Sequence, residues 1–73
     1  MTYETISRSA NGRYSIGQVE LTSGDMIEWL FGDEPMQSRV EHSDHVGYCV
    51  NAGNGYIPLA ELITARYLGS GRL

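Results

Sequence analysis

Residues 42–49 carry the side chains of this chain that are best suited to chemistry. His42, Asp44, His45 and Cys49 all have side chains that bind metal ions. Structural zinc needs three or four nitrogen or sulfur ligands in a tetrahedral arrangement, and this spacing supplies at most three from short range. Strand alternation also places Cys49 on the opposite side from Tyr48, away from a shared pocket. We therefore interpret the histidines as turn residues and Cys49 as a buried thiol, and we predict no metal site and no other cofactor.

The same residues make a poor catalytic set. A cysteine nucleophile needs a nearby positive group or a helix N-terminus to lower its pKa, whereas the segment around Cys49 is acidic. Asp33 and Glu34 are neighbours on a predicted turn, but glycoside chemistry needs two carboxylates across a cleft. No group of residues supplies nucleophile, base and stabiliser together. We expect a protein without catalytic residues, not an enzyme.

Charge is distributed unevenly along the chain, whose net charge is −4. Seven acids fall between Glu20 and Asp44, against Arg39 alone, and the flanking segments are slightly basic. This middle region is unsuited to free nucleic acid and suited to a basic protein surface. The structural alternative is a solvated acidic face that keeps a small protein soluble.

The arginines and tyrosines support a second reading. Tyrosine gives rigid contact area with a polar tip, and Tyr14, Tyr48 and Tyr56 together could line a groove for an extended peptide. Exposed tyrosines could instead stack on the bases of single-stranded nucleic acid. The cations for that alternative are the arginines of the flanking segments: Arg8, Arg13, Arg66 and Arg72.

Length and composition indicate one small domain over residues 1–73. A chain of this size buries only about 60% of its unfolded surface, which leaves little room for an internal cofactor cavity. Cys49 is the only cysteine, so an intramolecular disulfide is impossible. No apolar run approaches the roughly 20 residues that span a bilayer, and the polar start does not resemble a signal peptide. We expect a cytoplasmic protein.

The predicted core is centred on the strand Met26–Phe31, which contains the only Trp and the only Phe. Ile27, Trp29 and Phe31 alternate along it and would form one heavy apolar face. Turns are predicted at Asn11-Gly12, where both residues accept positive φ, at Ser23-Gly24-Asp25, and at 32–35. The remaining predicted strands are Tyr3–Ser7, Arg13–Ile16, Val19–Leu21, Met36–His42 with Met36, Ser38 and Val40 on one face, and Val46–Val50 with Val46, Tyr48 and Val50 on one face.

The C-terminal segment fits two structures. Leu59, Leu62, Ile63, Arg66 and Tyr67 lie at the spacing of one helical face, between Pro58 and Gly69. The alternative is one helical turn at Pro58–Leu62 followed by a strand, Ile63–Leu68, with Ile63, Ala65 and Tyr67 facing inward. A mostly β chain needs such a strand to cover its edge.

The order of these features resembles that of small SH3-like barrels. More narrowly, the chain is similar to a short domain family of bacteria and phages that has no assigned function. The similarity covers most of residues 12–68 and departs from the family at 31–35, where relatives usually carry a Trp; here the Trp stands earlier. The segments that carry it are Gly12-Arg13-Tyr14, Glu20-Leu21-Thr22-Ser23-Gly24-Asp25 with Ile27-Glu28, Arg39-Val40-Glu41-His42, Gly47-Tyr48, and Pro58-Leu59 with Ala65-Arg66.

This resemblance implies a mostly β, five-stranded SH3-like barrel with one short helical turn before the last strand. An α+β fold with a C-terminal helix over residues 58–68 is the alternative. Residues 1–11 and 69–73 lie outside most of the similarity, and we expect them to be flexible.

We interpret the chain as a non-enzymatic protein-interaction module of a phage or other mobile element, which binds a basic host surface as an anti-CRISPR-type inhibitor would. A nucleic-acid-binding barrel and a homo-oligomer that pairs edge strands are the alternatives. The expected partner-binding residues are Glu20, Asp25, Glu28, Asp33, Glu34, Glu41, Asp44, Tyr48 and Tyr56.

Overall fold

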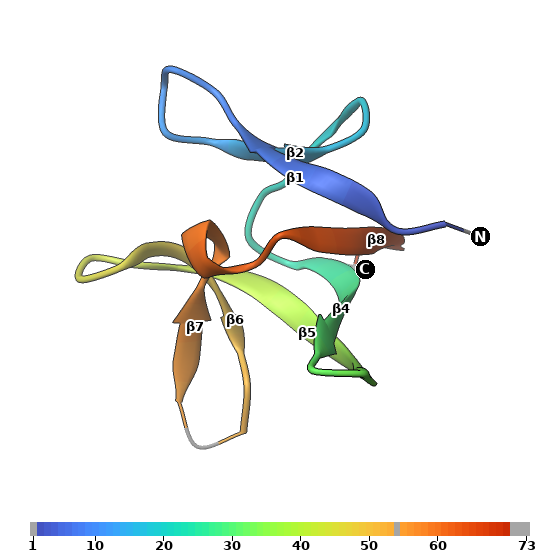
Figure 1. Cartoon of the computed structure of the whole chain (residues 1–73). Helices are drawn as coiled ribbons and strands as arrows, with labels where there is room; N and C mark the ends of the chain where they lie inside the picture. The colour runs from blue at the N-terminus through green and yellow to red at the C-terminus, as the bar shows by residue number, and fades with distance from the viewer. Residues whose placement is uncertain (1, 54, 71–73) are drawn as a thin grey trace.

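The described residues form an antiparallel β-sheet and one turn of 3₁₀ helix. The computed structural model describes residues 2–53 and 55–70. Eight strands lie in the order β3-β2-β1-β8-β4-β5-β6-β7 (Figure 1). In chain order the elements are β1 (Glu4–Arg8), β2 (Tyr14–Ile16), β3 (Val19–Glu20), β4 (Asp25–Phe31), β5 (Glu34–Ser43), β6 (Gly47–Asn51), β7 (Tyr56–Pro58), η1 (Leu59–Glu61) and β8 (Thr64–Ser70).

The prediction of a mostly β chain is confirmed, but the prediction of five strands was wrong. The extra strands are short, and β7 follows a Gly/Asn-rich loop and ends at Pro58. Proline is tolerated there because β7 is an edge strand that pairs only with β6. Among the described residues the two edge strands, β3 and β7, pair with one neighbour each, so the sheet is open.

Strand β4 lies at the centre of the core, as the sequence predicts. Ile27 and Trp29 are 0% and 1% exposed. Phe31 was expected to extend the same buried face, but it is 62% exposed. The pairing of β4 with β8 ends at Trp29 opposite Ala65, whereas Phe31 pairs only with Glu34 of β5. Phe31 therefore lies beyond the part of the sheet that the neighbouring strand covers.

The turn predicted at 32–35 is tighter than expected, because Gly32 and Asp33 alone join β4 to β5. Pro35 lies inside β5, opposite Leu30. The ladder between β5 and β6 begins at Val40, so the first half of β5 has a neighbour on one side only. Proline is acceptable in such a segment because no second strand needs its missing N–H group. The expected alternation along β5 holds, with Ser38 and Val40 both buried.

The predicted turn at residues 23–25 is confirmed. Gly24 has a φ of 100°, a conformation that glycine adopts without steric cost. Its N–H donates to the Val40 carbonyl at 2.9 Å, and the Asp25 N–H donates to the Thr22 carbonyl at 3.1 Å. The turn is thereby attached to β5 as well as to its own strand.

The C-terminal segment follows the second predicted structure, a short turn and a strand. Leu62 has φ −92° and ψ 142°, an extended conformation that ends η1 after one turn. β8 then pairs with both β1 and β4. The helix over residues 58–68 was wrong because these two strands supply the hydrogen bonds of the segment and bury Ala65 at 0% exposure.

Three side chains expected to face inward do not. Ile63 precedes β8 and is 77% exposed, and Phe31 is described above. Val46 precedes β6 and is 45% exposed, while Cys49 and Val50 are both fully buried.

The segment 1–11, expected to be flexible, contains β1, which pairs with β2 and β8. Gly69 and Ser70 are the last residues of β8, and residues 71–73 lie outside the described residues. Across 2–53 and 55–70, no helix is long and apolar enough to cross a membrane.

Candidate functional site

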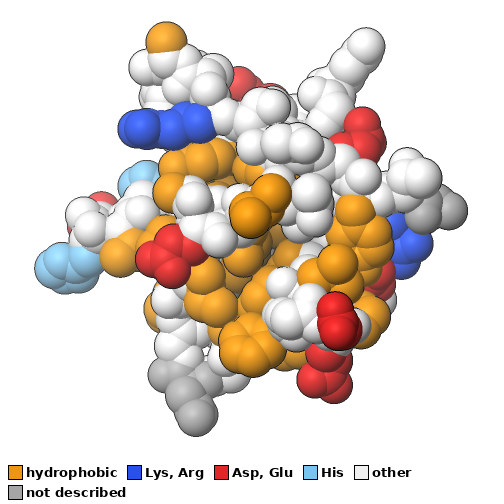
Figure 2. Space-filling model, viewed as in Figure 1, with side chains coloured by type: hydrophobic (Ala, Val, Ile, Leu, Met, Phe, Trp, Pro, Cys, Tyr) orange, Lys and Arg blue, Asp and Glu red, His pale blue; other side chains and the backbone are white. Residues whose placement is uncertain are grey.

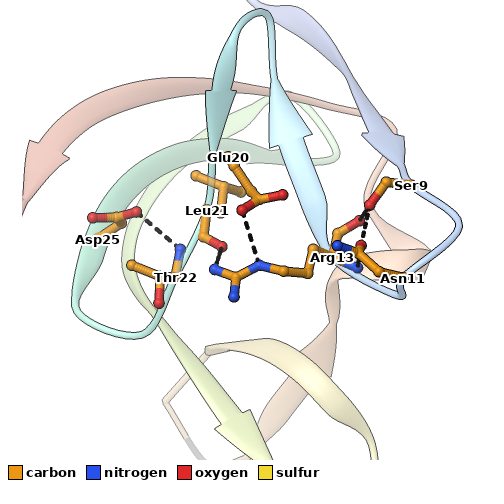
Figure 3. Close-up of polar contacts among 7 residues, drawn as sticks. All are labelled: Ser9, Asn11, Arg13, Glu20, Leu21, Thr22 and Asp25. Carbon is orange, nitrogen blue, oxygen red and sulfur yellow. Dashed lines mark hydrogen bonds and ion pairs between the residues drawn. The ribbon is translucent and has the colours of Figure 1, made fainter.

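The predicted acidic region divides into carboxylates that make internal contacts and carboxylates that face outward. Asp25 belongs to the first kind, because it is 3% exposed. Its Oδ2 accepts the Thr22 N–H at 3.0 Å (Figure 3). This carboxylate closes the turn before β4, so it is not available to a partner.

Glu20 is exposed but pairs with Arg13, whose Nε lies 3.3 Å from Glu20 Oε1. The same guanidinium donates to the Leu21 carbonyl at 3.0 Å (Figure 3) and lies 5.4 Å from the centre of the Tyr48 ring. The Asn11 side-chain oxygen accepts the backbone N–H of Arg13 at 3.0 Å and so holds the backbone from which this arginine extends. Arg13 and the half-buried Tyr48 are therefore held in structural contacts.

Glu28 is the centre of a row of side chains across the outer face of the sheet, which we call the polar ladder: Tyr3, Arg66, Glu28 and Gln37. Strand register places Arg66 and Gln37 on either side of Glu28. Arg66 donates to Glu28 Oε1 at 3.1 Å and Gln37 donates to the same atom at 3.2 Å. The Tyr3 hydroxyl donates to Oε2, and the Arg66 guanidinium lies 5.9 Å from the Tyr3 ring centre. The Glu28 side chain is only 10% exposed.

These contacts change the pKa of two members of the polar ladder, Glu28 and Tyr3. The hydrogen bond from Tyr3, followed by that from Gln37, lowers the pKa of the Glu28 carboxyl below its ordinary value. The bond to Glu28 and partial burial raise the pKa of the Tyr3 phenol. At neutral pH Glu28 is thus an ionised carboxylate with a full set of donors, which is a structural group rather than a binding group.

The remaining acids face outward in two separate groups. Asp33 and Glu34 are exposed at the β4–β5 turn, whereas Asp44 is exposed and Glu41 half-buried at the β5–β6 end. β5 has ten residues, and at 3.3–3.4 Å per residue its ends are up to about 30 Å apart. The molecule itself measures 30 Å along its longest axis. The structure therefore brings these acids together as two pairs and not as one continuous face.

The arginines of the nucleic-acid alternative are similarly divided. Arg13 and Arg66 each form an ion pair within the chain, Arg13 with Glu20 and Arg66 with Glu28. Arg8 is exposed and lines a shallow hollow with Ile6 and Tyr14, and Arg72 lies outside the described residues.

Tyr14, Tyr48 and Tyr56 belong to three different strands, β2, β6 and β7. Tyr56 is 56% exposed, while Tyr48 lies under Arg13 and at 4.8 Å from the His42 ring centre. Only Tyr56 of these three presents most of its side chain outward.

The metal-binding side chains of residues 42–49 point to different surroundings. Cys49 is fully buried, and its Sγ donates to the Glu41 carbonyl at 3.6 Å. Burial, with a smaller contribution from the Glu41 charge, raises the pKa of this thiol. His45 is exposed, and its backbone N–H donates to Ser43 Oγ at 3.1 Å. In the part of the chain that the structure describes, no three His, Cys, Asp or Glu side chains are placed to hold a metal ion.

One surface feature was not predicted from the sequence, a depression with apolar and polar lining residues at the end of β4 and the start of β8. We call it the β4–β8 hollow, and it is lined by Leu30, Glu61, Leu62, Ile63 and Thr64. Leu30 is 41% and Ile63 is 77% exposed. The doublets Leu30-Phe31 and Leu62-Ile63 were the available signal, because neighbours in extended chain point to opposite sides and one of each pair must leave the core.

On the face shown in Figure 2, hydrophobic side chains gather around a hollowed centre and acidic side chains stand at its margin.

No known protein family, curated protein or solved structure matches this chain.

Proposed function

We propose that this chain is a non-enzymatic protein-interaction module that binds a basic surface of a partner protein through its outward carboxylates. The observation that carries the proposal is the division of the acids described above. Asp25 and Glu28 are buried in structural contacts, whereas Asp33, Glu34 and Asp44 are exposed. Exposed charges of one sign raise the association rate with an oppositely charged partner.

The sequence resemblance adds a setting to this proposal. The resemblance that the sequence suggests, to a short SH3-like family of bacteria and phages, would make this a module encoded by a phage or other mobile element and acting on a host protein. A basic nucleic-acid-binding channel is a natural target, because a compact acidic protein competes there with phosphate charges. An anti-CRISPR-type inhibitor would act in this way.

Direct nucleic-acid binding is the less favoured function. It requires several free cations along one path, and Arg13 and Arg66 already donate to internal carboxylates or carbonyls. Glu20 and Glu28 would also stand beside any phosphate that approached these two arginines.

The experiment is capture of a partner from host lysate, with and without nuclease, by the wild type, two matched double variants and the four-site variant that combines them. Asp33→Asn/Glu34→Gln and Glu41→Gln/Asp44→Asn change the net charge equally at opposite ends of β5. We expect a nuclease-resistant basic partner whose binding is weakened by at least one variant and abolished when both pairs are neutralised. Retention by the four-site variant would refute the electrostatic mechanism, and loss of the partner on nuclease treatment would favour the nucleic-acid alternative.

A further inference from the structure

We infer that the β4–β8 hollow takes a bulky apolar side chain from a partner segment that carries arginine or lysine beside it. This inference rests on the proposed function and specifies where the basic partner inserts. It would make Leu30 and Ile63 the apolar contacts of the interface, and Glu61 with the β4–β5 turn acids its charged contacts.

The hollow is large enough to take a side chain, and three of its five lining residues are apolar. Its volume is about 240 Å³, and an apolar cavity of about 150 Å³ is enough to bind benzene. The apolar lining comes from Leu30, Leu62 and Ile63. Leu62 is partly buried and packs against the core, while Ile63, which lines the same hollow, is 77% exposed. Bulky apolar side chains left this exposed are typical of interaction sites when they surround a concave surface.

Charge complementarity selects the partner. Glu61 lines the hollow itself. Asp33 follows Leu30 by three residues, so its backbone lies within about 10 Å along the chain, and Glu34 pairs with Phe31 at the end of the hairpin. Arg66 is the arginine of β8, and its guanidinium is bound to Glu28 in the polar ladder. A cationic segment is therefore attracted to the rim of the hollow.

A second copy of the chain is the less suitable occupant. Self-association through this surface would bring Glu61 and the turn acids of one copy toward those of the other, since a two-fold interface places the same surface on both sides. The net charge of −4 adds to this repulsion. A basic partner gains attraction from the same carboxylates.

The test is a titration of the ¹⁵N-labelled protein with three capped hexapeptides, followed by amide shifts in ¹H–¹⁵N spectra at low salt. RRLFRR combines apolar and basic residues, RRGSRR lacks the apolar pair, and SSLFSS lacks the charge. We expect RRLFRR to shift amides of residues 30–34 and 61–64 and to bind at least about tenfold more tightly than either control peptide. Equal binding of RRGSRR, or shifts confined to other residues, would overturn the inference.

Two pairs of variants give the test its specificity. Ile63→Ser should weaken RRLFRR about tenfold or more, while Val46→Ser, at an exposed apolar residue before β6, should change affinity less than about twofold. Glu61→Gln should weaken binding more than Asp44→Asn, and added salt should reduce the difference. Equal effects within either pair would contradict the assignment of the hollow.

The two proposals fail in different ways. If the partner captured from lysate is lost with the four-site variant but retained by Ile63→Ser, the electrostatic function stands, and the partner does not contact the β4–β8 hollow. If RRLFRR binds at the hollow but no partner depends on the acids, the hollow is a binding site and the proposed function fails.

Discussion

Replacing Ser38 with alanine tests how the core satisfies its buried polar groups. Trp29 is 1% exposed, and its Nε1–H donates to Ser38 Oγ at 3.0 Å. The Ser38 hydroxyl in turn donates to the Asn51 carbonyl at 2.8 Å. This two-bond relay joins β4, β5 and the end of β6 inside the molecule.

The expected loss follows from the two groups that the substitution leaves behind. A buried donor without a partner costs about 1–3 kcal/mol, and the second lost hydrogen bond costs about 0.5–1.5 kcal/mol. We therefore expect Ser38→Ala to lower the free energy of unfolding by about 2–4 kcal/mol. A domain of this length has about 4–11 kcal/mol in total, so the variant should keep its fold with a much lower midpoint.

Urea denaturation followed by far-UV circular dichroism measures this loss. At about 4–8 °C per kcal/mol, the thermal midpoint should also fall by at least about 8 °C. Ser7→Ala is the matched control, because Ser7 is exposed on β1 and should change stability by no more than about 0.5 kcal/mol.

A double-mutant cycle decides whether the relay is the cause. In a Trp29→Phe background the indole N–H is absent, so Ser38→Ala should cost about 1 kcal/mol less than in the wild type. The same loss in both backgrounds, or a loss below about 0.5 kcal/mol in the wild type, would refute the reasoning.

Three further experiments probe the polar ladder, the core and the Cys49 thiol. The pKa of Glu28 is lower in the folded state than in the unfolded chain, so the ionised carboxylate stabilises the fold at pH values above about 4.3, and this contribution is lost as the pH falls through the folded-state pKa. The difference in urea midpoint between the wild type and Glu28→Gln should therefore become smaller in acid. A difference that does not change with pH would contradict this expectation. Ile27→Ala should cost about 2–5 kcal/mol and Ile63→Ala no more than about 0.5 kcal/mol in the same urea assay, and equal losses would show that their burial is misassigned. Cys49 should react slowly with a thiol reagent in buffer and rapidly in urea, because burial shields the sulfur and raises its pKa; rapid labelling of the native protein would contradict its place in the core.

Local rules were enough to predict the central strand and its turns. Gly24 adopts the positive φ that its turn requires, and the alternation of Ile27 and Trp29 identifies the buried side of β4. Both features depend on residues within a few positions of each other. The same rules failed for Phe31 and Ile63, because the end of a buried face is decided by how far the neighbouring strand extends.

The roles of the acids could not be predicted from their spacing. Glu28 lies 38 positions from Arg66 and 25 positions from Tyr3. The register of β8 against β4 brings Arg66 to Glu28, and the pairing of β1 with β8 brings the segment that begins with Tyr3 alongside. A count of charges between Glu20 and Asp44 treats Glu28 and Asp33 alike. The structure distinguishes them, since one carboxylate is enclosed by donors and the other is exposed at a turn.

This distinction also ranks the two ends of β5 as binding surfaces. The β4–β5 end places Asp33 and Glu34 close to the β4–β8 hollow, where charge and apolar contact area combine. The β5–β6 end carries Asp44 in the turn that follows β5, and His42, near the end of that strand, packs its ring against Tyr48. Hydrophobic contact supplies affinity, and charge supplies the approach rate and the choice of partner. We therefore expect Asp33→Asn/Glu34→Gln to weaken partner binding more than Glu41→Gln/Asp44→Asn, although both variants remove the same charge. The reverse order in a binding assay with purified proteins would place the interface at the β5–β6 end of the strand.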